Sequence, residues 1–263
     1  MSEWLGSCMA DETDTTMVKT ARTTFRILEA IKARDEATVT ELTDEFSLSK
    51  SSIHNYLKTL EHDGYVVREG NTYRVGLRLL DLAGYARHKQ RIYQTAKEEV
   101  TKLAAETGEM TNLLVEEHGR GIYLHRANGE QAVTSDSYIG HRVHLHNTAL
   151  GQAILAQLPR ERVEEIVDQH GLPKTTENTI TDREELFDRL EQVREDGVAY
   201  DDEARLAGLR CVAKAIVNKD GEVEGAISIS GPTSRFQGER WRTELPEKLE
   251  SAANVIELNI NYT

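Results

Sequence analysis

Four of the nine histidines and one of the two cysteines are candidates for binding a transition metal. His144 and His146 would share one face of an extended segment. The other candidates are His125, His141 and Cys211. Zinc needs three or four ligands that converge on one point, and spacing alone does not show convergence. Because dispersed polar histidines are commoner than metal sites, we expect no cofactor and leave a metal role of these histidines open.

Hydrolysis by a serine, a histidine and an aspartate is a second chemistry to weigh. Ser228 or Ser230 could supply the nucleophile, and Asp201 the acid. The chain has no Gly-x-Ser-x-Gly elbow, and serines within a strand do not sit on a strained turn. We therefore expect a protein that is not an enzyme. A redox-sensing role of Cys211 would need an accessible thiol with a lowered pKa, so a small buried side chain is the favoured role.

A third group of side chains could contact DNA from one face of a helix at residues 50–63. On a helical wheel Ile53, Leu57 and Leu60 fall together, whereas Asn55 and Lys58 lie on the opposite side. The apolar stripe would pack on neighbouring helices, and the polar groups are short enough to approach base edges. Residues at the helix N-terminus and on a following hairpin could contact backbone phosphates. Together with these, the candidate DNA-binding residues are Lys50, Ser51, Ser52, His54, Asn55, Lys58, Arg68 and Arg74.

Any solvated helix face carries such residues, so the order of the surrounding elements decides between the two interpretations. Periodicity predicts helices at residues 19–33 and 39–46, and a third helix that Ser49 caps and Gly64 ends. Two short strands follow at residues 65–68 and 72–75. This order is typical of a winged helix-turn-helix, which we place at residues 18–76, after an acidic tail at residues 1–17 that we expect to be mostly disordered.

The rest of the chain alternates between helical and strand patterns. We expect a linker helix at residues 77–91 and an effector-binding domain at residues 92–263. Its predicted strands are residues 110–116, 121–126, 132–138, 198–201, 211–217 and 225–230. Its predicted helices are residues 93–106, 148–157, 160–170, 182–196 and 239–260. With a hairpin turn at residues 220–221, this pattern predicts an α+β fold with a mainly antiparallel sheet.

Composition limits the function further. The 263 residues suit two domains, and no run approaches the ~20 apolar residues of a membrane span. Without a secretory signal or a disulfide framework, we expect a cytoplasmic protein. The net charge of −13 seems unfavourable for DNA binding, but residues 19–76 carry nine basic and nine acidic side chains and can present a local basic face. The acidity suggests that the host has a high-salt cytoplasm, as a halophilic archaeon does. The alternative is that this is an ordinary acidic cytosolic protein.

Three segments resemble the IclR (isocitrate lyase regulator) family of transcription factors. They read LSKSSIHNYLKTLEHDGYVVREGNTYRVGLRLLDLA, IGHRVHLHNTALGQAILA and GVAYDDEARLAGLRCVAKAIVNKDGEVEGAISISGP. The resemblance implies a winged helix-turn-helix, a linking helix and a GAF/PAS-like effector domain, assembled as homodimers or homotetramers on operator DNA. It also implies repression or activation that a small, usually anionic or polar, metabolite controls.

The resemblance places effector-binding positions at Ala132, Ser135, Ala149, Leu150, Asp201, Cys211, Ser228 and Ser230. Strand alternation independently puts Ser228 and Ser230 on one face, beside a face of small residues that includes Cys211. Such faces leave a cavity or admit a closely packed helix. Arg205 could pair with an anionic ligand or be an exposed surface arginine. The alternative function is a stand-alone metabolite-binding or hydrolytic protein whose N-terminal domain mediates protein contacts.

Overall fold

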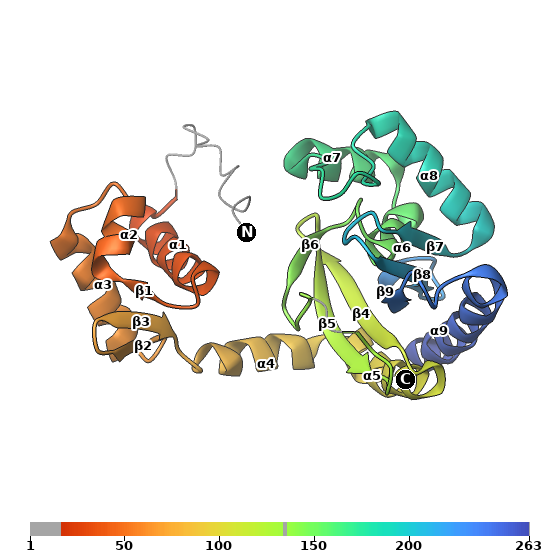
Figure 1. The fold of residues 1–263 in the computed structure, drawn as a ribbon, viewed down its shortest axis with the longest axis horizontal. Coiled ribbons are helices and arrows are strands. Elements are labelled where there is room, and N and C mark those ends of the chain that lie inside the picture. The colour runs from red at the N-terminus through yellow and green to blue at the C-terminus, as the bar shows by residue number, and fades with distance from the viewer. Residues whose placement is uncertain (1–16, 134–135, 263) are drawn as a thin grey trace. The chain divides into compact units, whose positions relative to one another are not determined.

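The computed structural model describes residues 17–133 and 136–262, which form two compact units divided between Gly84 and Tyr85 (Figure 1). Each unit has a hydrophobic core of its own. The division falls inside α4 (Leu79–Lys89), and the domain limits predicted at residues 76 and 91 remain predictions. The predicted acidic tail lies, apart from Met17, outside the described residues. No described helix is long and apolar enough to cross a membrane.

The first unit follows the predicted order of elements and adds one strand. Its elements are α1 (Lys19–Ala33), β1 (Ala37–Thr38), α2 (Val39–Glu45), α3 (Lys50–His62), β2 (Val66–Glu69) and β3 (Thr72–Val75). The strands pair antiparallel in the order β1-β3-β2. Strand β1 could not be predicted, because two residues ahead of a helix are too few to show alternation. The unit is a winged helix-turn-helix, as predicted.

Side-chain caps and a glycine set the helix ends in this unit. Thr38 and Glu41 form a capping box: the Thr38 hydroxyl accepts from the Glu41 N–H at 3.2 Å, and the Glu41 carboxylate accepts from the Thr38 N–H at 2.7 Å. Ser49 accepts from the Ser52 N–H at 3.2 Å and so caps α3. Gly64 follows the end of α3 with a φ of +77°, a conformation that favours glycine. These caps fix where α3 begins and ends.

The second unit is a sheet covered by helices on both faces. Its helices are α5 (Arg91–Thr107), α6 (Ala149–Gln157), α7 (Arg160–His170), α8 (Arg183–Asp196) and α9 (Leu245–Tyr262), the last preceded by a π-helical segment at Arg240–Glu244. Its strands are β4 (Met110–Glu117), β5 (Arg120–Asn128), β6 (Arg142–His144), β7 (Ala199–Asp202), β8 (Leu209–Val217) and β9 (Val223–Pro232). They pair antiparallel in the order β6-β5-β4-β9-β8-β7, which confirms the α+β class.

The two faces of this sheet pack against different helices (Figure 1). Helices α6, α7 and α8 share one core cluster with Ala226 of β9, whereas α5 and α9 share the other with Ile227 and Ile229. Successive β9 side chains therefore point to opposite faces, as alternation predicts. The predicted hairpin turn is confirmed, because β8 and β9 pair through it and Gly221 there has a φ of +81°.

The strand predicted at residues 132–138 is wrong for the residues that the structure describes in it, which have no strand structure. The edge of the sheet is formed instead by β6, which pairs with β5. Val143 and Leu145, two residues apart, are buried and hold this segment against the sheet, whereas Tyr138 and Ile139 are exposed. The buried alternating pair decides which segment becomes the edge strand.

Candidate DNA interface and effector pocket

Helix α3 separates a buried stripe from an exposed polar face. Ile53 and Leu57 are fully buried, and Leu60 is nearly so. The exposed candidates for DNA contact are Lys50, Ser51, His54, Asn55 and Lys58. The separation matches the helical wheel, because residues three and four apart lie on one face of a helix. The structure therefore leaves these polar groups free to meet a partner outside the first unit's core.

Ser52 differs from the other candidates, because it takes part in the cap of α3. It is half-buried, its N–H donates to Ser49 Oγ, and its hydroxyl lies 2.9 Å from the same Oγ. Ser51 Oγ also lies 2.9 Å from Ser49 Oγ. The sequence predicts Ser49 only as a cap, yet its hydroxyl lies within hydrogen-bond distance of both serine hydroxyls at the N-terminus of α3. Ser49 thus orders the helix end at which a backbone phosphate could bind.

The two candidate arginines of the β2–β3 wing bond within the wing. Arg68 Nε donates to the Gly70 carbonyl at 3.0 Å. Arg74 Nε donates to Glu69 Oε1 at 2.5 Å, and both side chains of this pair are about half exposed. Exposed ion pairs are weak, typically ~0–1 kcal/mol, so a phosphate could replace Glu69 as the partner of Arg74.

One row of side chains, most of them polar, lies in register across four strands of the second unit. Met110 of β4 pairs with Ser230 of β9, Ser230 with Cys211 of β8, and Cys211 with Asp201 of β7. In the next row along the face, Asn112 pairs with Ser228. Asn112 Nδ2 donates to the hydroxyls of Ser228 at 3.3 Å and of Ser230 at 3.5 Å. The sheet face thus presents a buried polar patch.

A cavity lies over this patch, next to the N-terminus of α6. Its lining residues are Met110, Asn112, Tyr123, Ser137, Thr148, Ala149, Leu150, Asp201, Arg205, Leu209, Cys211, Ser228 and Ser230. Its volume of about 20 Å³ holds about one water molecule. The lining includes the predicted effector positions Ala149, Leu150, Asp201, Cys211, Ser228 and Ser230. Ala132 lies outside the lining, and Ser135 lies outside the described residues.

Burial dominates the electrostatics of the cavity wall. It raises the pKa of Asp201 to about 7, although the Ala204 N–H that donates to Asp201 Oδ1 at 2.6 Å acts in the opposite direction. Burial also raises the pKa of Tyr123 to about 12 and that of the Cys211 thiol well above its usual range. Near neutral pH Tyr123 and Cys211 are therefore uncharged, and Asp201 is uncharged in part.

Arg205 supplies the positive charge of this site. Its side chain is only 12% exposed, and Nη2 donates to Asp136 Oδ1 and Oδ2, both at 2.8 Å. It follows Ala204, whose carbonyl accepts from the Thr179 hydroxyl at 2.6 Å. Of the two alternatives for Arg205, the structure therefore excludes the one in which it is an exposed surface arginine. Two lining residues, Asn112 and Tyr123, could not be identified from the sequence; the available signal was an asparagine among the buried residues of β4.

Of the four histidines that were considered as metal ligands, His144 and His146 lie next to each other, with their ring centres 5.5 Å apart. No group of three or more His, Cys, Asp or Glu among the described residues could hold a metal ion. His144 bonds Arg120, and His146 lies 3.2 Å from the Pro173 carbonyl. Burial lowers the pKa of His144 to about 3 and that of His146 to about 4, so both are neutral at physiological pH. Ser228 and Ser230 hydrogen-bond no histidine among the described residues.

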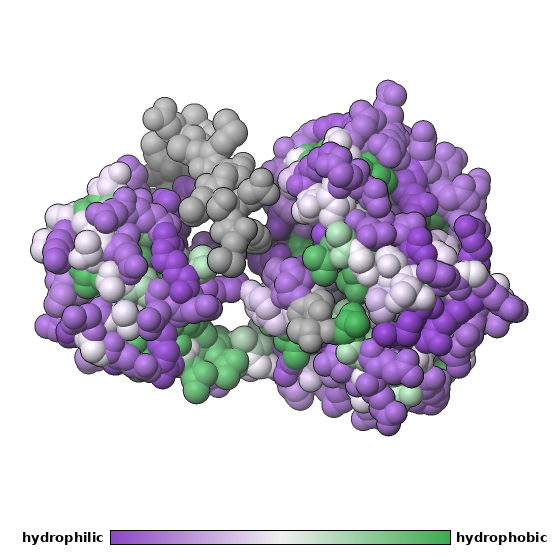
Figure 2. Space-filling model, in the orientation of Figure 1, coloured by the Kyte–Doolittle hydropathy of each residue, from purple (hydrophilic) through white to green (hydrophobic). Residues whose placement is uncertain are grey.

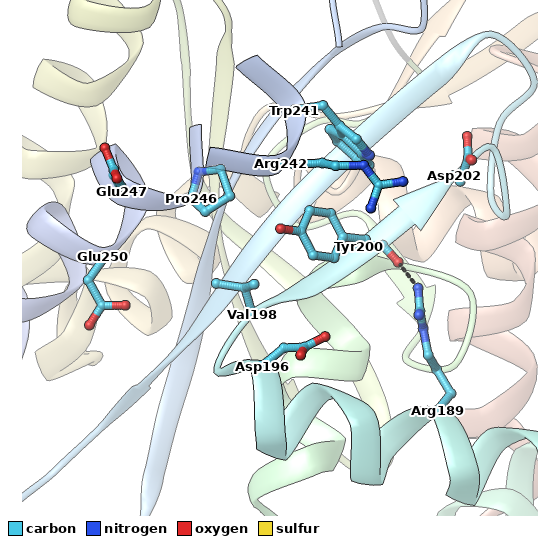
Figure 3. Close-up of a pocket in the computed structure, with 10 residues that line it drawn as sticks. All are labelled: Arg189, Asp196, Val198, Tyr200, Asp202, Trp241, Arg242, Pro246, Glu247 and Glu250. Carbon is cyan, nitrogen blue, oxygen red and sulfur yellow. Dashed lines mark hydrogen bonds between the residues drawn. The ribbon is translucent and has the colours of Figure 1, made fainter. Parts of the chain in front are cut away.

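A wider hollow of about 600 Å³ lies elsewhere on the second unit, between the end of α8 and the start of α9 (Figure 3). It is open to solvent and carries charges of both signs, including Arg189, Arg242 and Glu247. Arg189 Nη2 donates to the Tyr200 carbonyl at 2.8 Å across it. None of the predicted site residues lines this hollow. The small buried cavity is therefore the better candidate for a specific ligand.

Comparison with known proteins identifies both units. Residues 21–70 match the IclR helix-turn-helix domain, and residues 85–258 match the C-terminal domain of the bacterial transcriptional regulator IclR. The "Probable HTH-type transcriptional regulator ArcR" of Halobacterium salinarum is 34% identical over 238 residues, which cover 89% of this chain and 90% of that protein. The source of this relative is consistent with the halophilic host that the acidity suggests.

Solved structures of related proteins have a similar fold over about nine-tenths of this chain. The IclR of Thermotoga maritima is 30% identical with a TM-score of 0.75, over 92% of this chain and 99% of that one. An IclR homolog of Microbacterium hydrocarbonoxydans, complexed with 4-hydroxybenzoate, is 26% identical with a TM-score of 0.76, over 90% and 97%. The members of the family are transcriptional regulators. This chain belongs to the IclR family and is a DNA-binding transcriptional regulator.

Proposed function

We propose that α3 is the recognition helix and that it enters the major groove of operator DNA. Asn55 and Lys58 lie on its exposed face, opposite the buried stripe. An asparagine side chain can pair with an adenine edge, and a lysine can contact a guanine edge or a phosphate. Lys50 and Ser51, at the N-terminus that Ser49 caps, would fix the helix on a backbone phosphate.

The operator is contacted by two copies of the chain. In and just before α4, Leu77 is 74% exposed, Leu80 65% and Leu82 56%, and Tyr85 is also exposed. Figure 2 shows this apolar surface as a green patch around the start of α4. Apolar surface of this kind on a helix without buried residues is stable in water when it packs on a second copy. We expect a homodimer or homotetramer, and an operator with two pseudo-palindromic half-sites about one helical turn apart or a multiple of it.

A small polar or anionic metabolite controls this regulator by binding in the cavity over β4, β9, β8 and β7. The observation that carries this proposal is the convergence of Asn112, Asp201, Ser228 and Ser230 on one cavity, because polar groups buried together in this way require partners. The related IclR homolog that holds 4-hydroxybenzoate adds support, since it shares the fold of both units. The ligand would act by binding one of two conformational states more tightly than the other.

Footprinting on the promoter next to the protein's own gene, repeated across a panel of metabolites, tests this function. We expect a protected site that one metabolite weakens or strengthens. Ser228→Val should leave the footprint without ligand nearly unchanged and weaken the response to the metabolite, because it removes one hydroxyl of the second unit and leaves the first unit, which contains α3, unaltered. Lys219→Ala, a change on an exposed turn, is the control. A footprint that no metabolite alters, or an unchanged response in Ser228→Val, would contradict the effector proposal.

A further inference from the structure

Among the described residues that line the cavity, the one with a positive charge is Arg205. Its guanidinium already forms an ion pair with the carboxylate of Asp136. Arg205 lines the cavity with a side chain that is 12% exposed, whereas Asp136 is 60% exposed. Both carboxylate oxygens of Asp136 accept from the same nitrogen, Nη2. Nε and Nη1 of Arg205 bond to none of the described residues. Both edges of a guanidinium that can bind a carboxylate through two parallel bonds include Nη2, paired with either Nε or Nη1. A second carboxylate can therefore form the two parallel bonds that arginine forms best once Asp136 leaves Nη2.

The same cavity contains a buried acceptor without a donor. Asn112 is 2% exposed, and its amide nitrogen donates to Ser228 and Ser230. Its carbonyl oxygen Oδ1 is buried and has no hydrogen-bond partner among the described residues. Buried polar groups are nearly always paired, so this oxygen calls for a ligand or water hydroxyl that donates to it.

These two groups define the chemistry of the ligand. We propose that Arg205 binds the carboxylate of the effector, that Asn112 accepts from an effector hydroxyl, and that Asp136 occupies Arg205 until the effector arrives. The effector is then a small hydroxycarboxylic acid. This inference rests on the effector pocket proposed above and names its ligand class.

The structure also shows why the exchange of partners is feasible. The Asp136 carboxylate is largely hydrated, so its pair with Arg205 is weak compared with a carboxylate bound inside the cavity. The cavity of about 20 Å³ is too small for a metabolite, and a ligand enters only if a lining side chain such as that of Arg205 moves. Burial raises the pKa of Asp201 to about 7, so near neutral pH this carboxyl is charged only in part and competes for Arg205 less than a fully ionised carboxylate would.

Calorimetric titration of the full-length protein tests the proposal. The probes are lactate, glycerate, gluconate and 4-hydroxybenzoate, each paired with its primary amide, which keeps the hydroxyl and removes the charge. We expect at least one acid to bind at least about tenfold more tightly than its amide. Arg205→Gln should remove this preference, whereas Asp136→Asn should raise the affinity for the acid about three- to tenfold, because the internal competitor is lost. Asn112→Leu should weaken binding of acid and amide alike.

Matched controls come from an arginine–aspartate pair on the surface of the second unit, Arg183 with Asp168. Arg183→Gln and Asp168→Asn should leave the affinities unchanged. The proposal is overturned if no acid binds, if acid and amide bind equally, or if Asp136→Asn fails to bind the acid more tightly. If amides bind and change operator affinity in a Ser228-dependent manner, the effector pocket stands and only the role of Arg205 fails. If acids bind as proposed and operator affinity does not change, the effector function fails instead.

Discussion

Replacing Asp201 by asparagine should remove a pH-dependent loss of stability from the second unit. Asp201 is 4% exposed, and burial raises its pKa from 3.8 to about 7. When folding raises the pKa of a carboxyl, the group makes its full contribution to the free energy of unfolding below its unfolded pKa. This contribution is lost as pH rises through the folded pKa. The loss proceeds at ~1.4 kcal/mol for each pH unit, so the wild type should lose about 3 kcal/mol between about pH 5 and pH 7 relative to a neutral residue at this position.

Asparagine keeps an oxygen that can accept from the Ala204 N–H, so the loop that carries Arg205 should stay in place. The assay is urea unfolding followed by a signal from the second unit, at several values from about pH 5 to pH 8. The stability of Asp201→Asn minus that of the wild type should rise with pH and level off above the folded pKa. Asp188→Asn, at an exposed position on α8, serves as the control and should show no such rise. A difference that is independent of pH would refute the assignment of Asp201 as a buried, partly protonated carboxyl.

Three further substitutions or treatments follow from the packing. Leu57→Ala, at a fully buried position of α3, should cost the first unit about 2–5 kcal/mol in thermal or denaturant unfolding, because it leaves a cavity. Glu109→Gln should destabilise the second unit by about 3–5 kcal/mol, because the fully buried Glu109 carboxylate bonds Arg235 at 2.8 and 2.6 Å; a loss below 1 kcal/mol would contradict its structural role. Cys211 is half-buried and its pKa is raised, so it should react with iodoacetamide more slowly in the native protein than after unfolding.

The first unit could be predicted almost completely, because its signals are local. The α3 stripe, the Ser49 cap and the Gly64 stop each act within a few residues, and each lies where the sequence places it. The two-residue β1 could not be predicted, because its pairing with β3 depends on the tertiary fold. Burial within α1 shows a related limit of periodicity. Phe25 has the helical spacing that predicts a buried position, yet it is exposed and Ile27 is buried instead.

The cavity could be predicted only in part. Alternation along β9 places Ser228 and Ser230 on one face, which the paired strands confirm. Alternation fails for Asn112, because β4 is buried on both faces and its pattern has no polar side. Arg205 depends on contacts across the unit: Asp136 lies 69 positions away in sequence, and Thr179, which holds the Arg205 loop, follows α7. No local pattern encodes those contacts.

The most direct test of DNA recognition by α3 is fluorescence anisotropy of a labelled operator fragment, measured against a scrambled fragment at several salt concentrations. Asn55→Ala should weaken operator binding by ~1–3 kcal/mol and bring it closer to binding of the scrambled fragment. Lys58→Ala should weaken binding to both fragments and lower the salt slope by about one if it contacts a phosphate. Lys102→Ala, which removes the same charge from an exposed position of α5, should bind as the wild type does. Wild-type affinity and salt slope in both α3 variants would contradict the assignment of α3 as the recognition helix.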